Sequence, residues 1–219
     1  MDSDMQDYKS RFFELALKKG NLRFGSFTLK SGRVSPYFFN AGGFDDGASL
    51  SELAHCYAAA ISHSGIAFDM LFGPAYKGIP LAAATAIAMY DAHGRNVPYA
   101  YNRKEAKDHG EGGVIVGAAL AGKVLIIDDV ISAGTSVRES IGIIESAGAV
   151  ASGISIALDR QERGAGELSA AQEVSCEYGI PCCAIAGLDD LIKFLKSKDG
   201  AGIDINAIQK YREHYGTEA

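Results

Sequence analysis

Two adjacent acids stand at the end of a strongly apolar stretch and before a turn of small and hydroxyl residues. Asp128 and Asp129 follow four branched apolar residues at 124–127, a pattern typical of a strand buried on both faces. The turn at 130–136 leads into a helix expected over 138–147. Backbone N–H groups of the turn and the positive end of the helix favour an anion, whereas the carboxylates suit hydroxyls, a metal ion or a developing positive charge. The sequence therefore predicts a site for a sugar phosphate with free hydroxyls.

For the acid pair alone a plainer explanation is favoured, since buried strands of α/β proteins commonly end in solvated or capping acids. A second strand and helix, expected over 67–73 and 79–93, flank a Gly/Pro loop that carries Lys77. A lone turn lysine is usually solvated, but a loop of this kind before a helix is also able to bind an anion.

Residues 103–113 combine three basic residues, three acids, one histidine and three glycines without apolar periodicity, which predicts a mobile surface loop. A solvated hairpin tip would have the same mixed charge. Against that alternative, Arg103, Lys104, Lys107 and His109 cluster within seven positions. Such a cluster of cations favours a lid that closes over a polyphosphate.

The N-terminal part lacks the alternation of strands and helices seen in the remainder. After a first helix, short strands are expected within 23–40, around a turn that carries Lys30. We expect residues 1–45 to form a small hood beside the main sheet. On composition alone, Phe38 and Phe39 indicate no more than a hydrophobic strand, and Lys30 a solvated turn lysine.

The remaining residues, 46–219, predict a single α/β domain with a central, mostly parallel, five-stranded sheet flanked by helices. One strand ends in Asp159 and Arg160, which would either face the ligand edge or form an ion pair that fixes a loop. Helices are expected over 8–19, 49–64, 79–93, 138–147, 170–178, 188–198 and 205–215, and strands over 67–73, 97–102, 114–117, 124–127, 150–158 and 181–186.

Composition limits the classes of partner and compartment. The chain has 219 residues, 47% of them hydrophobic, and a formal net charge of −6, which gives no reason to expect nucleic acid or a membrane as partner. Its four cysteines show no C-x-x-C spacing, which indicates reduced thiols. The acidic N-terminus lacks the apolar segment of a signal peptide, so a cytoplasmic location is expected.

The run VLIIDDVISAGTS resembles the phosphoribosyl-diphosphate-binding signature of the type I phosphoribosyltransferases. It is neither a Walker loop nor a G-x-G-x-x-G turn. The segments FTLKSGRVSPYFFN, GPAYKG, RKEAKDHGEGG and LDR extend the likeness over nearly the whole chain. With them, the chain is most similar to the orotate-specific branch of that family.

The resemblance implies transfer of the phosphoribosyl group from 5-phospho-α-D-ribose 1-diphosphate to orotate, giving orotidine 5'-phosphate and diphosphate in de novo pyrimidine (UMP) biosynthesis. It implies an oxocarbenium-like displacement that depends on Mg²⁺, which is held mainly by substrate and water near Asp128 and Asp129 without direct protein ligands. It also implies a homodimer in which the lid, residues 103–113, acts on the neighbouring subunit. A non-proline cis peptide bond is implied at Ala75–Tyr76.

The resemblance also implies a role for each matching position. The implied catalytic residues are Lys107, Asp128, Asp129, His109 and Arg103. The implied contacts to phosphoribosyl diphosphate are Lys30, Tyr76, Lys77, Arg103, Lys104, Lys107, His109, Asp128, Asp129, Val130, Ile131, Ser132, Ala133, Gly134, Thr135 and Ser136. The implied contacts to orotate are Lys30, Phe38, Phe39, Ser132 and Arg160. Ser132 departs from the family, which has Thr there; it keeps the hydroxyl and loses a methyl group.

Three other functions are compatible with parts of the pattern. An enzyme of the same fold could use a purine base, although the phenylalanine pair and Arg160 favour an anionic pyrimidine. A regulatory protein could keep the sugar-phosphate site as a sensor, but it would be expected to lose the lid cations or to gain a basic DNA-binding segment. A generic sugar-phosphate-binding domain would leave the basic loop unexplained.

Overall fold

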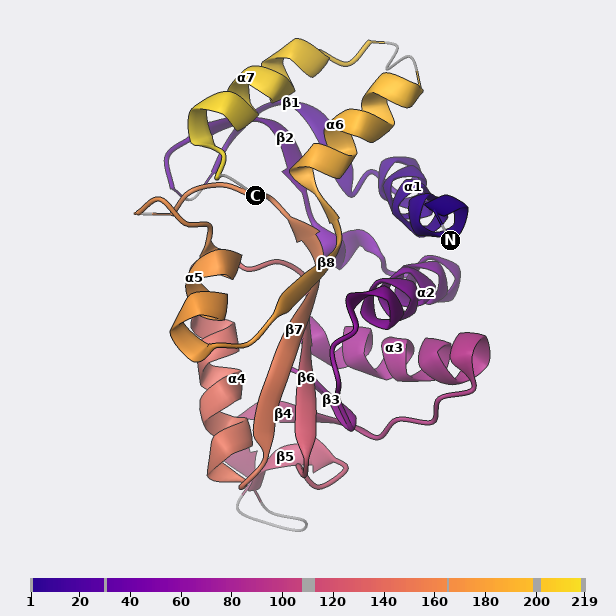
Figure 1. Cartoon of the computed structure of the whole chain (residues 1–219), viewed down its shortest axis with the longest axis vertical. Helices are drawn as coiled ribbons and strands as arrows, with labels where there is room; N and C mark the ends of the chain where they lie inside the picture. The colour runs from indigo at the N-terminus through magenta and orange to yellow at the C-terminus, as the bar shows by residue number, and fades with distance from the viewer. Residues whose placement is uncertain (1, 30, 108–112, 165, 199–201, 218–219) are drawn as a thin grey trace.

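Strands and helices alternate along most of the chain in a computed structural model that describes residues 2–29, 31–107, 113–164, 166–198 and 202–217 (Figure 1). The helices are α1 (Asp2–Lys18), α2 (Gly47–Ser64), α3 (Gly78–His93), α4 (Thr135–Ser146), α5 (Ala170–Tyr178), α6 (Leu188–Ser197) and α7 (Ile205–Tyr215), with a short 3-10 turn at Ala41–Gly43. The strands are β1 (Leu22–Thr28), β2 (Val34–Phe39), β3 (Met70–Gly73), β4 (Tyr99–Lys107), β5 (Gly113–Gly117), β6 (Lys123–Asp128), β7 (Val150–Asp159) and β8 (Cys182–Gly187).

The main sheet has the strand order β5-β4-β3-β6-β7-β8. Strands β4, β3, β6, β7 and β8 pair in parallel, whereas β5 pairs antiparallel with β4. The predicted mostly parallel sheet is therefore confirmed. It has six strands and not five, because β5 adds an antiparallel strand at the edge.

Helices cover both faces of this sheet, with α4 and α5 on one side and α1, α2 and α3 on the other (Figure 1). In β6, residues 124–127 are all fully buried. Leu125 and Ile127 belong to the larger hydrophobic core with α1, α2 and α3, and Val124 and Ile126 to the smaller one with α4 and α5. Because successive side chains of a strand point to opposite faces, an uninterrupted apolar run fits this double burial.

Strands β1 and β2 form a separate antiparallel sheet, which lies with α6 and α7 at one end of the molecule (Figure 1). The predicted short strands are thus present. Helix α1 nevertheless packs into the larger core, where Phe12 and Phe13 are buried. The assignment of residues 1–45 as a separate part therefore stays a prediction.

One predicted loop is partly wrong. Residues 103–107 continue strand β4, and Lys107 pairs with Gly113 of β5, where a loop was expected from residue 103 onward. Backbone hydrogen bonds of a hairpin stabilise a strand whose side chains are polar, so polarity alone did not predict it. The rest of the predicted loop, 108–112, lies outside the described residues.

Two further properties follow from side-chain composition and burial. None of the helices in the described ranges is long and apolar enough to cross a bilayer. None of the four cysteines, all of which are described, forms a disulfide bond, and burial raises the pKa of both Cys182 and Cys183. A raised thiol pKa lowers the thiolate fraction and hence the reactivity.

Candidate active site

A crevice lies at the carboxyl edge of the sheet, between the loops that follow β3 and β6. These strands are parallel neighbours, yet the helices that follow them, α3 and α4, pack into the two different cores on opposite faces. The loops after β3 and β6 consequently diverge, which is the arrangement that forms ligand sites in open α/β sheets. Both sequence motifs, at 73–78 and 128–136, lie in these two loops.

The loop after β3 is tightly packed at its glycines. A Cβ atom on Gly73 would lie 2.1 Å from the carbonyl oxygen of Gly78, and one on Gly78 would lie 2.8 Å from that of Ile127. The amide of Ala75 donates to Oδ1 of Asn102 at 2.9 Å. The predicted cis peptide at Ala75–Tyr76 is confirmed.

Asp128 and Asp129 are each only 7% exposed at the end of β6. Asp128 accepts from the amide of Asp129 at 2.9 Å and from Oγ of Ser136 at 3.1 Å. Burial, and secondarily the charge of Asp129, raise the pKa of Asp128 to about 6. Beneath them, the buried hydroxyl of Tyr57 donates to the carbonyl oxygen of Asp128 at 2.7 Å.

Lys77 links the two loops. Its Nζ lies 2.6 Å from Oδ2 of Asp129, whose side chain is 10% exposed, while the lysine side chain is 53% exposed. The cation is therefore reachable by a ligand and already positioned over the acid pair.

The hydroxyl-rich turn ends where α4 begins at Thr135. Gly134 caps the helix with a φ of +72°, and a Cβ there would lie 2.8 Å from Val174, so glycine is required. Arg138 stabilises the turn by donating hydrogen bonds to the carbonyl oxygen of Ala133 and to the carboxylate of Glu177. The amino end of α4 is thus presented as an anion site beside the acids.

A cleft of about 630 Å³ extends from this edge towards β1 and β2. Among the predicted site residues, it is lined by Phe38, Phe39, Lys77, Val130, Ile131, Ser132 and Arg160. Phe39 packs against Phe12 and Phe44 of the core, whereas Phe38 lies against Phe27, with Arg23 above its ring. The two aromatic side chains therefore line one cleft from differently anchored positions.

Arg160 is held within this cleft by three neighbours. Its Nη2 lies 2.5 Å from Oε1 of Glu162 and donates to Oγ of Ser35 at 3.1 Å. Its guanidinium also lies 4.3 Å from the ring centroid of Tyr37. Both predicted alternatives are thus partly met: Asp159 and Arg160 line the cleft, and Arg160 forms an ion pair, although its partner is Glu162 and not Asp159.

A second cleft, of about 1080 Å³, lies between β4, β5 and α4. Arg103 and Lys104 line this cleft together with Thr135 and Ser136, which follow the hydroxyl-rich turn at the start of α4. Nζ of Lys104 lies 5.3 Å from the ring of Tyr76. Lys30 and His109 lie outside the described residues, and of Lys107 only the backbone, at the end of β4, is described.

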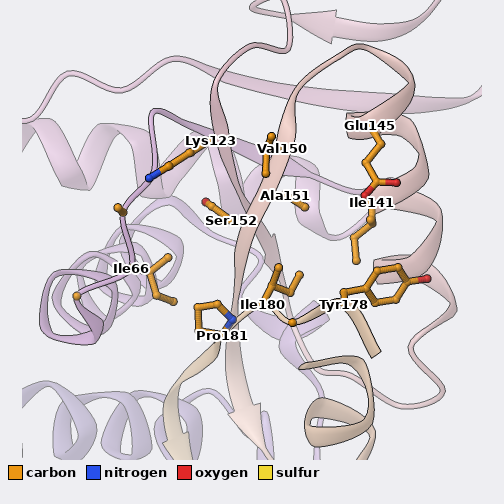
Figure 2. Close-up of a pocket in the computed structure, with 13 residues that line it drawn as sticks. Ile66, Lys123, Ile141, Glu145, Val150, Ala151, Ser152, Tyr178, Ile180 and Pro181 are labelled. Carbon is orange, nitrogen blue, oxygen red and sulfur yellow. The ribbon is translucent and has the colours of Figure 1, made fainter. Parts of the chain in front are cut away.

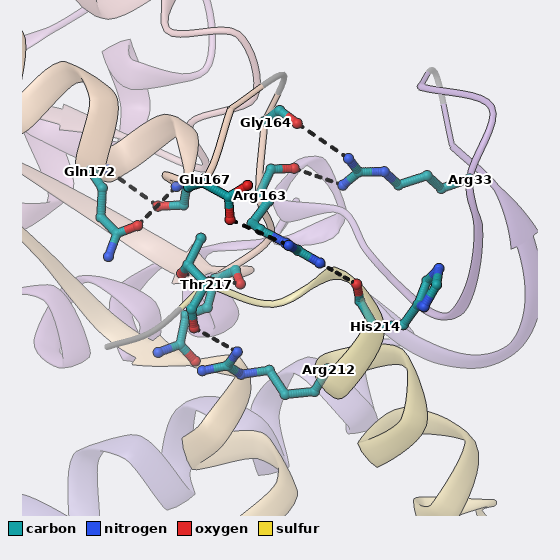
Figure 3. A network of polar contacts seen from close by, with 10 residues as sticks. Arg33, Arg163, Gly164, Glu167, Gln172, Arg212, His214 and Thr217 are labelled. Atoms are coloured by element: carbon teal, nitrogen blue, oxygen red, sulfur yellow. Dashed lines mark hydrogen bonds and ion pairs between the residues drawn. The ribbon is translucent and has the colours of Figure 1, made fainter.

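Sequence reasoning missed a network that joins distant segments beside the cleft that Phe38 and Arg160 line (Figure 3). Arg33 donates to the carbonyl oxygens of Arg163 and Gly164, and Arg163 donates to that of His214. Arg33 and Glu162 also line the cleft. The charged run DRQER at the end of β7 was a local indication, but Arg163 within it meets Arg33 and His214, which lie 130 and 51 positions away.

A third cleft, of about 580 Å³, lies at the opposite, amino edge of the sheet (Figure 2). It is lined by the starts of β6 and β7, including Lys123 and Val150, and by Glu145, Tyr178 and Pro181. None of the predicted site residues whose side chains are described lines this cleft.

Comparison with known proteins agrees with this geometry. Residues 45–177 match the family model described as "Phosphoribosyl transferase domain". Orotate phosphoribosyltransferase of Thioalkalivibrio sulfidiphilus is 61% identical over 97% of this chain and 100% of its own, and that of Neisseria meningitidis serogroup C is 60% identical over 98% and 100%. The crystal structure of orotate phosphoribosyltransferase from Francisella tularensis superposes with a TM-score of 0.84 at 42% identity, covering 94% of this chain and 99% of that one.

Full-length identity of this degree, a matching domain and a shared fold agree with the two loops at the crevice. The chain belongs to the orotate phosphoribosyltransferase family of pentosyl-transferring enzymes.

Proposed function

We propose that this enzyme transfers the phosphoribosyl group from 5-phospho-α-D-ribose 1-diphosphate to orotate, giving orotidine 5'-phosphate and diphosphate in pyrimidine biosynthesis. The observation that carries the proposal is the position of the acid pair. Asp128 and Asp129 lie between an anion-binding helix start at Thr135 and a cleft bounded by Phe38 and Arg160. The relatives named above bear the same activity in their names.

In the proposed reaction, the bond from C1 of the ribose to diphosphate breaks while a bond to a ring nitrogen of orotate forms. Positive charge develops on the sugar and negative charge on the leaving diphosphate. Asp128 and Asp129 stabilise the first charge. Lys77, with Lys30, Arg103, Lys107 and His109 expected from the family, stabilises the second. Lys107 is the residue whose contact we expect to strengthen most in the transition state.

The cleft that Phe38, Ser132 and Arg160 line, which we call the acceptor cleft, suits a planar anion. The ring of orotate would stack on an aromatic side chain, for which Phe38 lies at the surface of the cleft. Its carboxylate would be bound by the guanidinium of Arg160. Ser132, which lines the same cleft, offers a hydroxyl to the base.

The donor set at the acids fits Mg²⁺. Two adjacent carboxylates offer hard oxygen ligands, and Mg²⁺ commonly uses one or two carboxylates with water and substrate phosphates. Within the described ranges, no group of three or more His, Cys, Asp or Glu side chains could hold a metal by itself. The ion would be held mainly by substrate and water, close to Asp128 and Asp129, whose negative charge favours a cation there. When bound, the ion neutralises charge on the leaving diphosphate.

The proposal includes a homodimer with the lid of each subunit over its neighbour's site, in the cytoplasm. Ile87 and Tyr90 lie three positions apart on α3 and are 62% and 61% exposed. Large apolar side chains exposed on one helix face support an interface with a second copy. Lid closure would exclude water, which otherwise hydrolyses the activated sugar.

The test follows the loss of orotate absorbance with phosphoribosyl diphosphate and magnesium, for the wild type and for Lys107→Ala. We expect the wild type to consume orotate and the variant to be slowed by about a hundredfold or more with substrate binding largely kept. A wild type that binds phosphoribosyl diphosphate but leaves orotate untouched would contradict the proposal, and adenine, guanine and hypoxanthine would then be tested as acceptors.

A further inference from the structure

The arginine of the acceptor cleft is already paired with a carboxylate of the protein. Arg160 and Glu162 have side chains only 21% and 12% exposed, and Nη2 of the arginine lies 2.5 Å from Oε1 of the acid. The same Oε1 accepts from the hydroxyl of Tyr37 at 3.3 Å. The guanidinium of Arg160 is therefore already paired before an anionic acceptor binds.

The second contact of Arg160 uses the same nitrogen. Nη2 also donates to Oγ of Ser35, which is fully buried and itself donates to the carbonyl oxygen of Tyr37. Nη2 carries two hydrogen atoms, and Glu162 and Ser35 account for both. The arginine is thereby fixed on the ring of Tyr37.

The geometry of the guanidinium group makes it significant that both hydrogen atoms of Nη2 are already used. A carboxylate that binds arginine through two parallel hydrogen bonds uses Nη2 in both available arrangements, either with Nε or with Nη1. A bidentate contact with an acceptor carboxylate therefore requires that Nη2 release Glu162 or Ser35. The hydroxyl of Tyr37, which already reaches Glu162, offers that acid an alternative partner when it is released.

We propose that Glu162 is a resident substitute for the acceptor carboxylate and a determinant of acceptor affinity. Glu162 keeps the partly buried Arg160 neutralised in the free enzyme, and the carboxylate of the acceptor displaces Glu162 from Nη2. This inference rests on the proposed function, since it takes orotate as the acceptor. Two costs then limit orotate binding: the contact that Glu162 gives up, and repulsion between two carboxylates at one arginine.

The variant Glu162→Gln separates charge from position. The amide oxygen still accepts from Arg160 and from the hydroxyl of Tyr37, so the arginine stays in place, but the negative charge is gone. Orotate would then meet an uncompensated guanidinium and no competing anion. We expect the dissociation constant and the KM of orotate to fall about tenfold, as is typical for removal of one like charge at close range.

Calorimetric titration with orotate, and its KM at saturating phosphoribosyl diphosphate and magnesium, measure the effect. Uracil, which lacks the carboxylate, serves as the neutral ligand, and any binding of it should be equal in the wild type and in Glu162→Gln. The matched control is Glu167→Gln, because Glu167 also pairs with an arginine, Arg163, but is 90% exposed. It should leave the KM of orotate unchanged.

A purely structural Glu162 would give a different result. If Glu162→Gln binds orotate equally or more weakly than the wild type, or strengthens uracil as much as orotate, the substitution model is overturned. A wild type that neither binds nor consumes orotate would overturn the proposed function and this inference together. A wild type that uses orotate, with a Glu162→Gln variant that gains no affinity, overturns only the inference.

Discussion

Nζ of Lys77 lies 2.6 Å from Oδ2 of Asp129, so the cation after β3 neutralises an acid after β6 across the crevice. The free site is internally paired here, as it is at Arg160 and Glu162. Binding of phosphoribosyl diphosphate would exchange these partners, with the leaving diphosphate taking Lys77 and the sugar facing Asp129. Charges that are held in place before binding need little reorganisation during the reaction.

Lys77→Met tests this exchange. We expect the KM of phosphoribosyl diphosphate to rise and kcat/KM to fall by about a hundredfold, because a preorganised contact to the developing negative charge is lost. The lysine side chain is 53% exposed, so the loss of its ion pair should cost only about 1 kcal/mol of unfolding free energy. Steady-state kinetics and urea unfolding measure the two effects.

Lys123→Met is the matched control, since Lys123 begins the same strand, β6, at the amino edge of the sheet. It should leave kcat/KM unchanged. An equal loss of kcat/KM in both lysine variants, or a Lys77→Met enzyme with normal kinetics, would contradict the assigned role.

The elevated pKa of Asp128 predicts a pH-dependent gain of stability in Asp128→Asn. Because burial raises the pKa of Asp128 to about 6, the folded state retains a proton that the unfolded chain has released between about pH 4 and pH 6. The stability contributed by this residue therefore falls as pH rises through that window. The asparagine variant has no such loss and should be more stable than the wild type by up to about 3 kcal/mol at pH 8.

Urea unfolding of both proteins at pH 4.5, 6 and 8 measures this difference. Asparagine can keep both side-chain contacts of Asp128, by accepting from the amide of Asp129 and donating to Ser136. The advantage should shrink towards zero at the lowest pH. Asp91→Asn, at an exposed residue near the end of α3, should show a small difference that does not vary in this way. A pH-independent advantage for Asp128→Asn would refute the electrostatic explanation.

Much of the fold was predictable because the core determines it through local patterns. The apolar run of β6 predicted a strand buried on both faces, and the ends of β3, β6 and β7 placed Lys77, Asp128 and Arg160 near one edge. The extension of β4 was not predictable from side-chain polarity, because the strand ends in a backbone pairing of Lys107 with Gly113 across the hairpin.

Partners of site residues were much harder to predict than the residues themselves. The sequence offered Asp159 as a neighbour for Arg160, but the backbone turns so that Oδ1 of Asp159 accepts from the amide of Gln161. Arg160 meets Glu162 and the distant Ser35 instead. Such pairings depend on how β2 packs beside the loop after β7, which no local spacing encodes.

Tyr57 is predicted to support the acid pair from below. Its fully buried hydroxyl donates to the carbonyl oxygen of Asp128 at 2.7 Å. Tyr57→Phe leaves that buried carbonyl without this donor, which should cost about 1–2 kcal/mol of unfolding free energy and lower kcat by a few fold. Thermal unfolding and kinetics check both effects. Tyr99→Phe, at a residue of β4 that is 38% exposed, is the control and should change neither.

A lid that acts on the neighbouring subunit predicts complementation between two inactive variants. Lys107→Ala disables the lid of its own chain, and Asp129→Asn disables the acids of its own chain. In a mixed dimer, one of the two sites would combine an intact lid from one subunit with intact acids from the other.

Random reassortment of equal amounts would make half of the dimers mixed, so about a quarter of wild-type activity should return. The measurement is orotate consumption after the two variants are unfolded together and refolded, compared with each variant refolded alone. If each lid closed over its own subunit, every site of a mixed dimer would carry one of the two lesions. No site would then be intact, because the two lesions lie in different chains. Activity no higher than the mean of the two separate variants would therefore show that the lid serves its own subunit.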